Sequence, residues 1–113
     1  MSDNQLSTKE KIHYTNLWCR SIGIKSLDLT EHPKIDDVIF LIKFRQSVWY
    51  DMNNTERGIW SGIWSWVYHN KYTLTKKNLG KLEKIASNVI YRQQLHQQQR
   101  QKLCLLERLK LPQ

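Results

Sequence analysis

The side chains that could bind a metal ion or act as nucleophiles are few and widely separated. No two of them stand at the C-x-x-C or H-x-x-x-H spacing that presents a pair of ligands to one zinc ion. The sequence therefore predicts no metal site, and the histidines are expected on the surface or half-buried. These side chains are His13, His32, His69, His96, Cys19 and Cys104.

Local patterns typical of catalysis are also missing from the sequence. It contains neither the strained Gly-x-Ser-x-Gly turn of a serine nucleophile nor a glycine-rich phosphate loop. The adjacent Asp36 and Asp37 follow Pro33 in an expected first helical turn, where the helix dipole favours negative charge. We expect a protein that is not an enzyme, with no cofactor and no evident small-molecule substrate. An unrecognised enzyme remains the alternative, because catalytic partners can meet in space from distant positions.

Positive charge is concentrated in the C-terminal part of the chain. The net charge is +8, and the Lys/Arg and Asp/Glu residues of 1–70 cancel. Residues 71–113 hold ten basic and two acidic residues, which is the whole excess. Basic side chains along a helix can follow a phosphate backbone, and a solvated face or an acidic protein partner is the alternative. The candidate nucleic-acid contacts are Lys76, Lys77, Lys81, Lys84, Arg92, Arg100 and Lys102.

Two apolar stretches are candidates for a protein-binding surface. The first contains the tandem tetrapeptide GIWS-GIWS at 58–65. A period of four stacks like residues on a helix, so Trp60 and Trp64 should form one ridge in the core. Gly58 and Gly62 should let a neighbouring helix pack closely, and an exposed groove is the alternative. The second stretch is LCLLERLKL near the C-terminus, and the candidate protein contacts are Trp66, Leu103, Leu106 and Leu109.

Four helices are expected to position these residues. The first covers 8–22, capped by Ser7 with Glu10, and its apolar face should carry Tyr14, Leu17, Trp18 and Ile22. Gly23 should end this helix in a left-handed conformation. The second helix runs from Pro33 to about Met52.

The third and fourth helices carry the apolar and basic candidates. The third covers about 56–69, is capped by Asn53 with Glu56, and should end at a left-handed Asn70. The fourth is capped by Thr73 or Thr75. Its inner stripe should contain Leu79, Leu82, Ile85, Ala86, Val89 and Ile90.

The composition changes after residue 91. The segment RQQLHQQQRQ at 92–101 has six glutamines and Leu95 as its one apolar residue, so it cannot bury a face against the core. Gln and Arg are good helix formers, and the fourth helix can continue through it. We expect an all-α fold: a helical domain of about four helices at 6–91 and a basic, Gln/Leu-rich helical arm at 92–113.

The layout resembles small accessory proteins encoded by bacteriophages and prophages. The residues that carry this resemblance are the Trp-rich stretch ERGIWSGIWSWVYHN and the basic stretch TKKNLGKLEKIA, in a chain of 113 residues. The resemblance transfers no site residue, and it implies roles such as binding nucleic acid or inhibiting a host-defence complex.

The leading expectation is a protein that binds nucleic acid or a nucleoprotein complex through its basic C-terminal third. The alternative is a protein–protein inhibitor or adaptor, with a protein partner or a second copy on the Trp-rich helix and the Leu-rich terminus. No apolar run reaches the roughly 18 residues of a membrane span, so we expect no membrane partner. The N-terminus lacks the apolar segment of a signal peptide, and we expect a cytoplasmic protein, in the host cell if phage-encoded.

Overall fold

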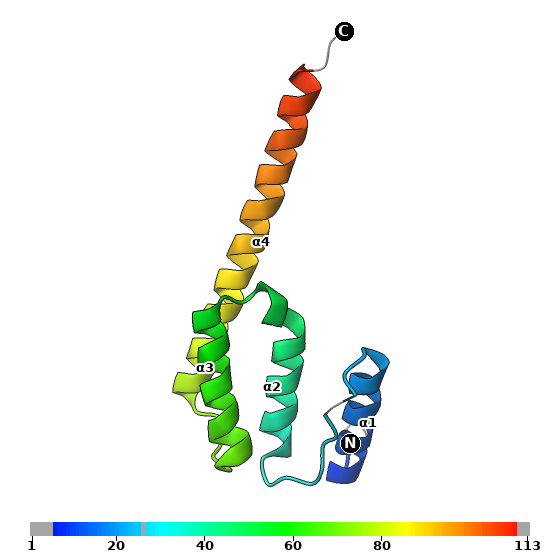
Figure 1. Ribbon diagram of the computed structural model, residues 1–113. Coiled ribbons are helices and arrows are strands. Elements are labelled where there is room, and N and C mark those ends of the chain that lie inside the picture. The colour runs from blue at the N-terminus through cyan, green and yellow to red at the C-terminus, as the bar shows by residue number, and fades with distance from the viewer. Residues whose placement is uncertain (1–5, 26, 111–113) are drawn as a thin grey trace, which may run out of the picture.

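Four α-helices follow one another in the computed structural model, which describes residues 6–25 and 27–110 (Figure 1). A 3-10 turn, η1 (Trp49–Asp51), follows the second helix, and a π turn, η2 (Ser65–His69), extends the third. No strand occurs in these two ranges, and the predicted all-α class is confirmed. The helices are α1 (Thr8–Ser21), α2 (Ile35–Val48), α3 (Asn54–Trp64) and α4 (Lys76–Lys110).

The predicted N-caps of the first and third helices are confirmed, and the third helix begins at Asn54, two residues before the predicted start. The Ser7 hydroxyl accepts the Glu10 N–H at 3.2 Å, and the Glu10 carboxylate accepts the Ser7 N–H at 3.1 Å. Asn53 and Glu56 form the same reciprocal pair at the start of α3. Thr75 rather than Thr73 caps α4, because its hydroxyl accepts a backbone N–H three residues on, at 3.1 Å. These bonds satisfy N–H groups that have no partner within the helix.

The start of α2 and the end of α3 differ from the predictions. Helix α2 begins at Ile35 rather than Pro33, because the Lys34 and Ile35 N–H groups turn back to bond His32 at 2.9 and 3.1 Å. After α3 the left-handed residue is Lys71, with φ 65°, and Asn70 stays right-handed. The reason is the wider π turn, in which the Asn70 N–H bonds a carbonyl five residues back and the chain reverses one residue later.

The core lies where α2, α3 and the first turns of α4 meet. The buried side chains of each helix are spaced three or four apart, so each helix turns one stripe inward. Leu79 and Ile90, predicted on the inner stripe of α4, are instead 36% and 52% exposed. The buried apolar residues of the three helices are Ile35, Val38, Leu41, Ile42, Trp60, Ile63, Leu82, Ile85 and Val89.

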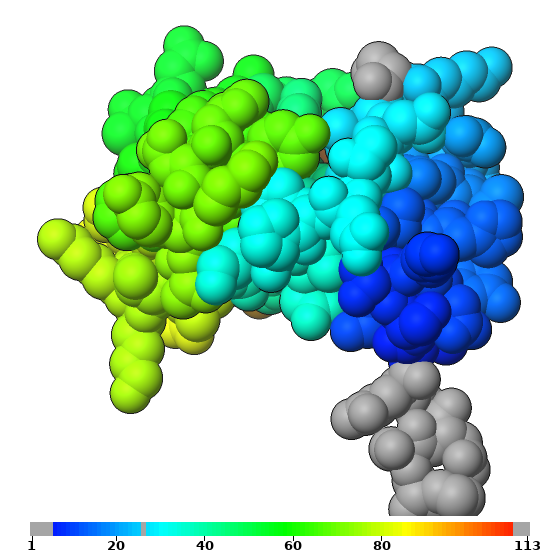
Figure 2. All heavy atoms as spheres, turned by 90° about the horizontal axis from the view of Figure 1, so that it is seen from below, coloured from blue at the N-terminus to red at the C-terminus, as the bar shows by residue number. Residues whose placement is uncertain are grey.

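Helix α1 turns a different face inward from the one its apolar spacing predicted. Tyr14 and Leu17 are 54% and 46% exposed, whereas Thr15 and Cys19 are buried. The deciding contact is polar: the Asn16 side chain donates to the Leu29 carbonyl at 3.2 Å and accepts its N–H at 2.8 Å. These two hydrogen bonds hold the linker that follows α1 against the side of α1. Seen from below, the linker and the start of α2 lie between α1 and the end of α3 (Figure 2).

The second half of α4 extends away from the other helices (Figure 1). All side chains at 93–109 are exposed. The radius of gyration is 19.2 Å, against about 13 Å for a globular chain of this length. The last hydrogen bonds to the bundle come from Arg92 and Gln93, at the start of the segment assigned to the arm.

The tandem glycines do not pack against a neighbouring helix. A Cβ atom built on Gly58 or Gly62 would meet no heavy atom within 4 Å. The expected close helix–helix contact at these glycines is therefore wrong. The two tryptophans of the repeat face inward, and the glycines lie on the sides of α3 that face solvent.

The open surroundings of Gly62 lead to a testable expectation. Gly62→Ala should raise the free energy of unfolding by about 0.5–1 kcal/mol, because alanine restricts the unfolded chain and fits a helix interior. The matched control is Gly23→Ala, which should destabilise the protein because Gly23 has φ 90°. Urea unfolding of both variants measures the two signs, and a lower midpoint for Gly62→Ala would show that a neighbour does pack there.

Candidate nucleic-acid interface

Three of the seven predicted nucleic-acid contacts form one line on an exposed face of α4. Lys77, Lys81 and Lys84 are spaced four and three apart and lie on one exposed stripe, which borders the stripe of buried residues that includes Leu82 and Ile85. All three lysines are exposed and span about 10 Å of helix. We call this line the outer lysine face.

The other four predicted contacts are placed differently. Lys76 lies beside the outer lysine face at the first residue of α4, and Lys102 returns to the same stripe on the arm at heptad spacing. Arg100 lies on the side of α4 nearer the bundle, where it lines a hollow together with Tyr50 and Arg92. The structure therefore does not bring all seven cations onto one surface.

No lysine of the outer lysine face forms an ion pair with an acid in the described ranges. Ion pairs there join Lys11 to Asp36, Arg20 to Asp28 and Arg92 to Glu56. None of them involves a lysine of α4. The positive charge of this face is therefore directed to solvent, where a phosphate backbone can reach it.

Arg92 has a structural partner that the sequence prediction missed. Its guanidinium forms two bonds with the Glu56 carboxylate, at 2.6 and 3.2 Å, and a third with the Asp51 carbonyl, at 2.8 Å. The Glu56 side chain is only 6% exposed. Hydrogen bonds from Arg92 lower the pKa of Glu56, opposing the effect of its burial. Arg92 thus fixes α4 to the start of α3, and its charge is paired with that of Glu56.

The predicted protein contacts fall into two separate places. Trp66 is 40% exposed, but its indole N–H donates to the Thr73 carbonyl at 3.0 Å and its ring packs on Tyr72. It therefore secures the loop before α4. Leu103 is 59%, Leu106 45% and Leu109 81% exposed on the arm. The arm extends away from the end of α3, so the structure does not unite Trp66 with the leucines (Figure 1).

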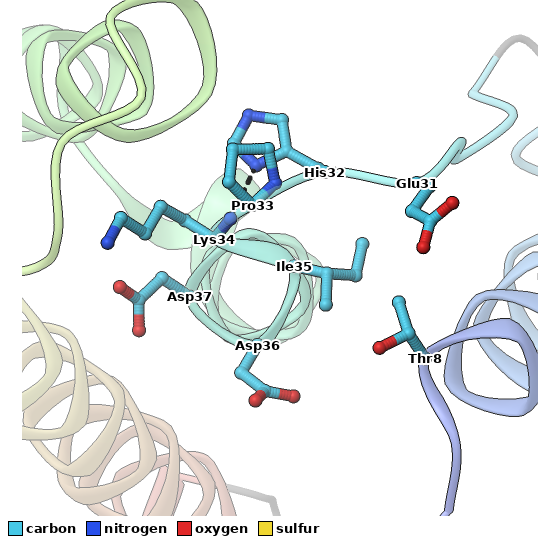
Figure 3. Close-up of a pocket in the computed structure, with 8 residues that line it drawn as sticks. All are labelled: Thr8, Glu31, His32, Pro33, Lys34, Ile35, Asp36 and Asp37. Atoms are coloured by element: carbon cyan, nitrogen blue, oxygen red, sulfur yellow. Dashed lines mark hydrogen bonds between the residues drawn. The ribbon is translucent and has the colours of Figure 1, made fainter.

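A hollow at the start of α2 contains several polar side chains (Figure 3). Asp36 pairs with Lys11 at 2.9 Å, and Asp37 accepts the Leu74 N–H at 3.1 Å. The Nδ1 atom of His32 accepts the Lys34 N–H, and its Nε2 atom lies 3.0 Å from the Tyr68 carbonyl oxygen. These groups hold α2 in place. Within 6–25 and 27–110, no three His, Cys, Asp or Glu side chains are grouped so that they could hold a metal ion.

The predicted tryptophan ridge is part of a column of stacked aromatic rings on α3 and η2. Trp60 stacks on Trp64 with ring centroids 5.3 Å apart, and Trp64 stacks on Tyr68 at 4.8 Å. The ridge predicted from the repeat is confirmed, and the spacing of four would also have found Tyr68. The edge-to-face contact of Trp49 on Trp60 at 5.8 Å joins two helices and left no signal in the sequence.

In the described part of the chain, no helix has both the length and the apolar character needed to cross a bilayer. Comparison of the chain with models of known families, with curated proteins and with solved structures found no match.

Proposed function

We propose that this protein binds nucleic acid through the outer lysine face of α4. The observation that carries the proposal is the alignment of Lys77, Lys81 and Lys84 on an exposed stripe that packs against nothing and pairs with no acid within the described ranges. Lys76 beside this stripe and Lys102 further along it enlarge the same positive surface.

The chemistry of this surface suits the phosphate backbone rather than base edges. Each lysine that neutralises a phosphate releases a condensed counterion, which makes binding favourable and dependent on salt. Lysine is a mobile point charge without the rigid fork of arginine, so it gives affinity with little sequence preference. The straight helix is about 52 Å long, long enough to lie along a nucleic acid beyond the bundle.

The test compares two variants that lose the same charge. Lys77→Gln with Lys81→Gln should weaken binding to duplex DNA of any sequence and make the log–log salt slope shallower by about 1.8, because each phosphate contact contributes about 0.9. The control is Lys9→Gln with Lys43→Gln, two exposed lysines outside α4. Fluorescence anisotropy over a salt series measures both slopes, and equal slopes for the two variants would contradict the proposal.

The exposed leucines of the arm favour a second function, that of an inhibitor or adaptor binding a protein. Leu103, Leu106 and Leu109 lie on a helix that no part of the bundle covers, and a free apolar helix face usually has a partner. The partner would be another protein or a second copy of the chain. Such a complex would survive high salt, whereas the lysine contacts would not.

A further inference from the structure

A stripe of exposed residues continues the outer lysine face of α4 along the arm. Its members are spaced alternately four and three residues apart, which is the spacing that faces a neighbouring helix in a coiled coil. The four apolar members, two at each end of the stripe, are 41–81% exposed. The stripe consists of Tyr91, Leu95, Gln98, Lys102, Leu105 and Leu109, and we call it the arm seam.

The order of residues in the arm seam is self-complementary. In an antiparallel pair of two arms centred on position 100, Tyr91 lies opposite Leu109 of the second copy. Leu95 lies opposite Leu105 of the second copy, and the two polar members lie opposite each other. Each of these contacts occurs twice, because the two copies present the same surface to each other. The apolar ends of the stripe therefore cover one another.

Other arrangements of two arms pair these residues less well. A shift by one heptad in either direction places Leu109 opposite Lys84 or Gln98, and it leaves no two apolar members of the arm seam opposite each other. A parallel pair places Lys102 opposite the same lysine of the second copy, so that like charges meet within the contact. In the antiparallel pair this lysine meets a glutamine instead. A single polar layer of this kind fixes register and orientation in coiled coils.

The charged residues of the arm do not oppose this pairing. Arg100 and Glu107 lie on the opposite side of the helix from the arm seam. The flanking positions bring no two cations together, and most of them hold glutamines, whose amides can bond to one another. Such neutral flanks favour a second copy over an acidic partner helix. The flanking pairs are Gln94 with Arg108, Gln99 with Gln99, Gln101 with Gln101 and Arg92 with Leu106.

The shape of the molecule leaves room for the second copy. The overlap of residues 91–109 is about 27 Å long, and the last hydrogen bonds from α4 to the bundle come from Arg92 and Gln93. The arm extends away from the other helices (Figure 1), so the bundle of the second copy would lie beyond the tip of the arm. The outer lysine face of each copy would stay uncovered.

We propose that the protein pairs with a second copy of itself through the arm seam, as an antiparallel pair of helices. The pairing removes three leucines and one tyrosine of each copy from water, and Lys102 can extend its stem along the seam with its ammonium in water. A single pair of helices forms a small interface, so we expect a micromolar dissociation constant. This inference names the partner for the protein-binding arm proposed above and rests on that second function, not on DNA binding.

Sedimentation equilibrium of the intact protein should show a mass that rises with concentration from 13.6 kDa towards twice that value. Leu105→Gln should raise the dissociation constant of the dimer about tenfold or more, because the symmetric contact loses this leucine twice. The matched control is Leu103→Gln. Leu103 and Leu105 are both 59% exposed on the same arm, but Leu103 lies outside the arm seam. Its replacement should leave the dissociation constant unchanged.

A charge placed in the arm seam tests the orientation of the two helices. Gln98→Glu should lower the dissociation constant several-fold at low salt, because the new carboxylate lies opposite Lys102 of the second copy. A parallel pair would instead bring two carboxylates together, and the dimer would weaken. Gln97→Glu, the same change of charge outside the seam, is the control and should have little effect.

Three results would overturn the proposal: a mass of 13.6 kDa at about 1 mM protein, equal dissociation constants for Leu105→Gln and Leu103→Gln, or a weaker dimer for Gln98→Glu than for Gln97→Glu. Circular dichroism shows that each variant keeps its helices. Leu105→Gln should still bind a short duplex DNA through the outer lysine face, so failure to dimerise and failure to bind DNA are separate results. A strictly monomeric protein would leave the second function to a different protein partner.

Discussion

Replacing Trp60 by alanine is expected to lower the free energy of unfolding by about 3–5 kcal/mol. The Trp60 side chain is 4% exposed, stacks on Trp64 and meets the edge of Trp49. Its indole N–H bonds the Leu41 carbonyl, so the variant also leaves that bond unmade. The loss is large against a typical stability of about 5–15 kcal/mol.

The measurement is urea unfolding followed by far-ultraviolet circular dichroism, which does not depend on tryptophan emission. Trp66→Ala is the matched control, because Trp66 is 40% exposed and should cost much less. An unchanged midpoint for Trp60→Ala would mean that the ring column is not part of the core.

Replacing Arg92 by glutamine is expected to destabilise the protein by about 2 kcal/mol at neutral pH. Removing one partner of an ion pair leaves the other charge uncompensated. When both partners are buried, this lowers the free energy of unfolding by about 3–5 kcal/mol. Arg92 is 38% exposed, which reduces the figure. Glu56→Gln should cost less than Arg92→Gln, because the guanidinium left alone can reach water.

The pH dependence gives the pair a second test. In the wild type the folded-state pKa of Glu56 is lowered, so the stabilisation is complete above the unfolded value of about 4.3 and is lost as the pH falls through the folded value. In Arg92→Gln the burial of Glu56 is opposed only by its hydrogen bonds with Asn53 and Asn88, so its pKa should be higher than in the wild type and acid should relieve more of the penalty.

The two stability curves should therefore converge as the pH falls below about 5. Urea midpoints of the wild type and Arg92→Gln between pH 7 and pH 3 measure this convergence. A constant gap across that range would mean that Arg92 acts through packing rather than through the Glu56 carboxylate.

The helix starts could be predicted because their deciding contacts are local. Ser7 and Glu10, like Asn53 and Glu56, are three residues apart and satisfy each other's backbone. The left-handed Gly23 was predicted for the same reason, since glycine readily takes a positive φ. Such features depend on a few neighbouring residues and not on the fold.

The features that escaped prediction depend on residues far apart in the chain. The inward face of α1 is set by Asn16, whose polar contact with Leu29 outweighs the apolar spacing of Tyr14 and Leu17. Arg92 looked like a phosphate contact because its partner Glu56 lies 36 residues earlier. Sequence spacing cannot show either contact, since both require the packed helices.

The candidate sites show the same division between local and long-range information. The outer lysine face follows from helix periodicity once α4 is known to be continuous. The spacing of its three lysines in the sequence was therefore enough to predict that they lie together. Arg45 on α2 rests on Trp60 of α3, and no local pattern indicates that approach.

The salt dependence of duplex DNA binding by the intact protein tests the central claim most directly. We expect Lys76, Lys77, Lys81 and Lys84 each to neutralise one phosphate. The logarithm of the association constant should then fall linearly with the logarithm of the salt concentration, with a slope of about −3.6. The same slope should hold for unrelated sequences, since lysines that contact phosphates carry no base recognition. Failure to bind duplex DNA at low salt, or binding whose strength does not change with salt, would contradict the account.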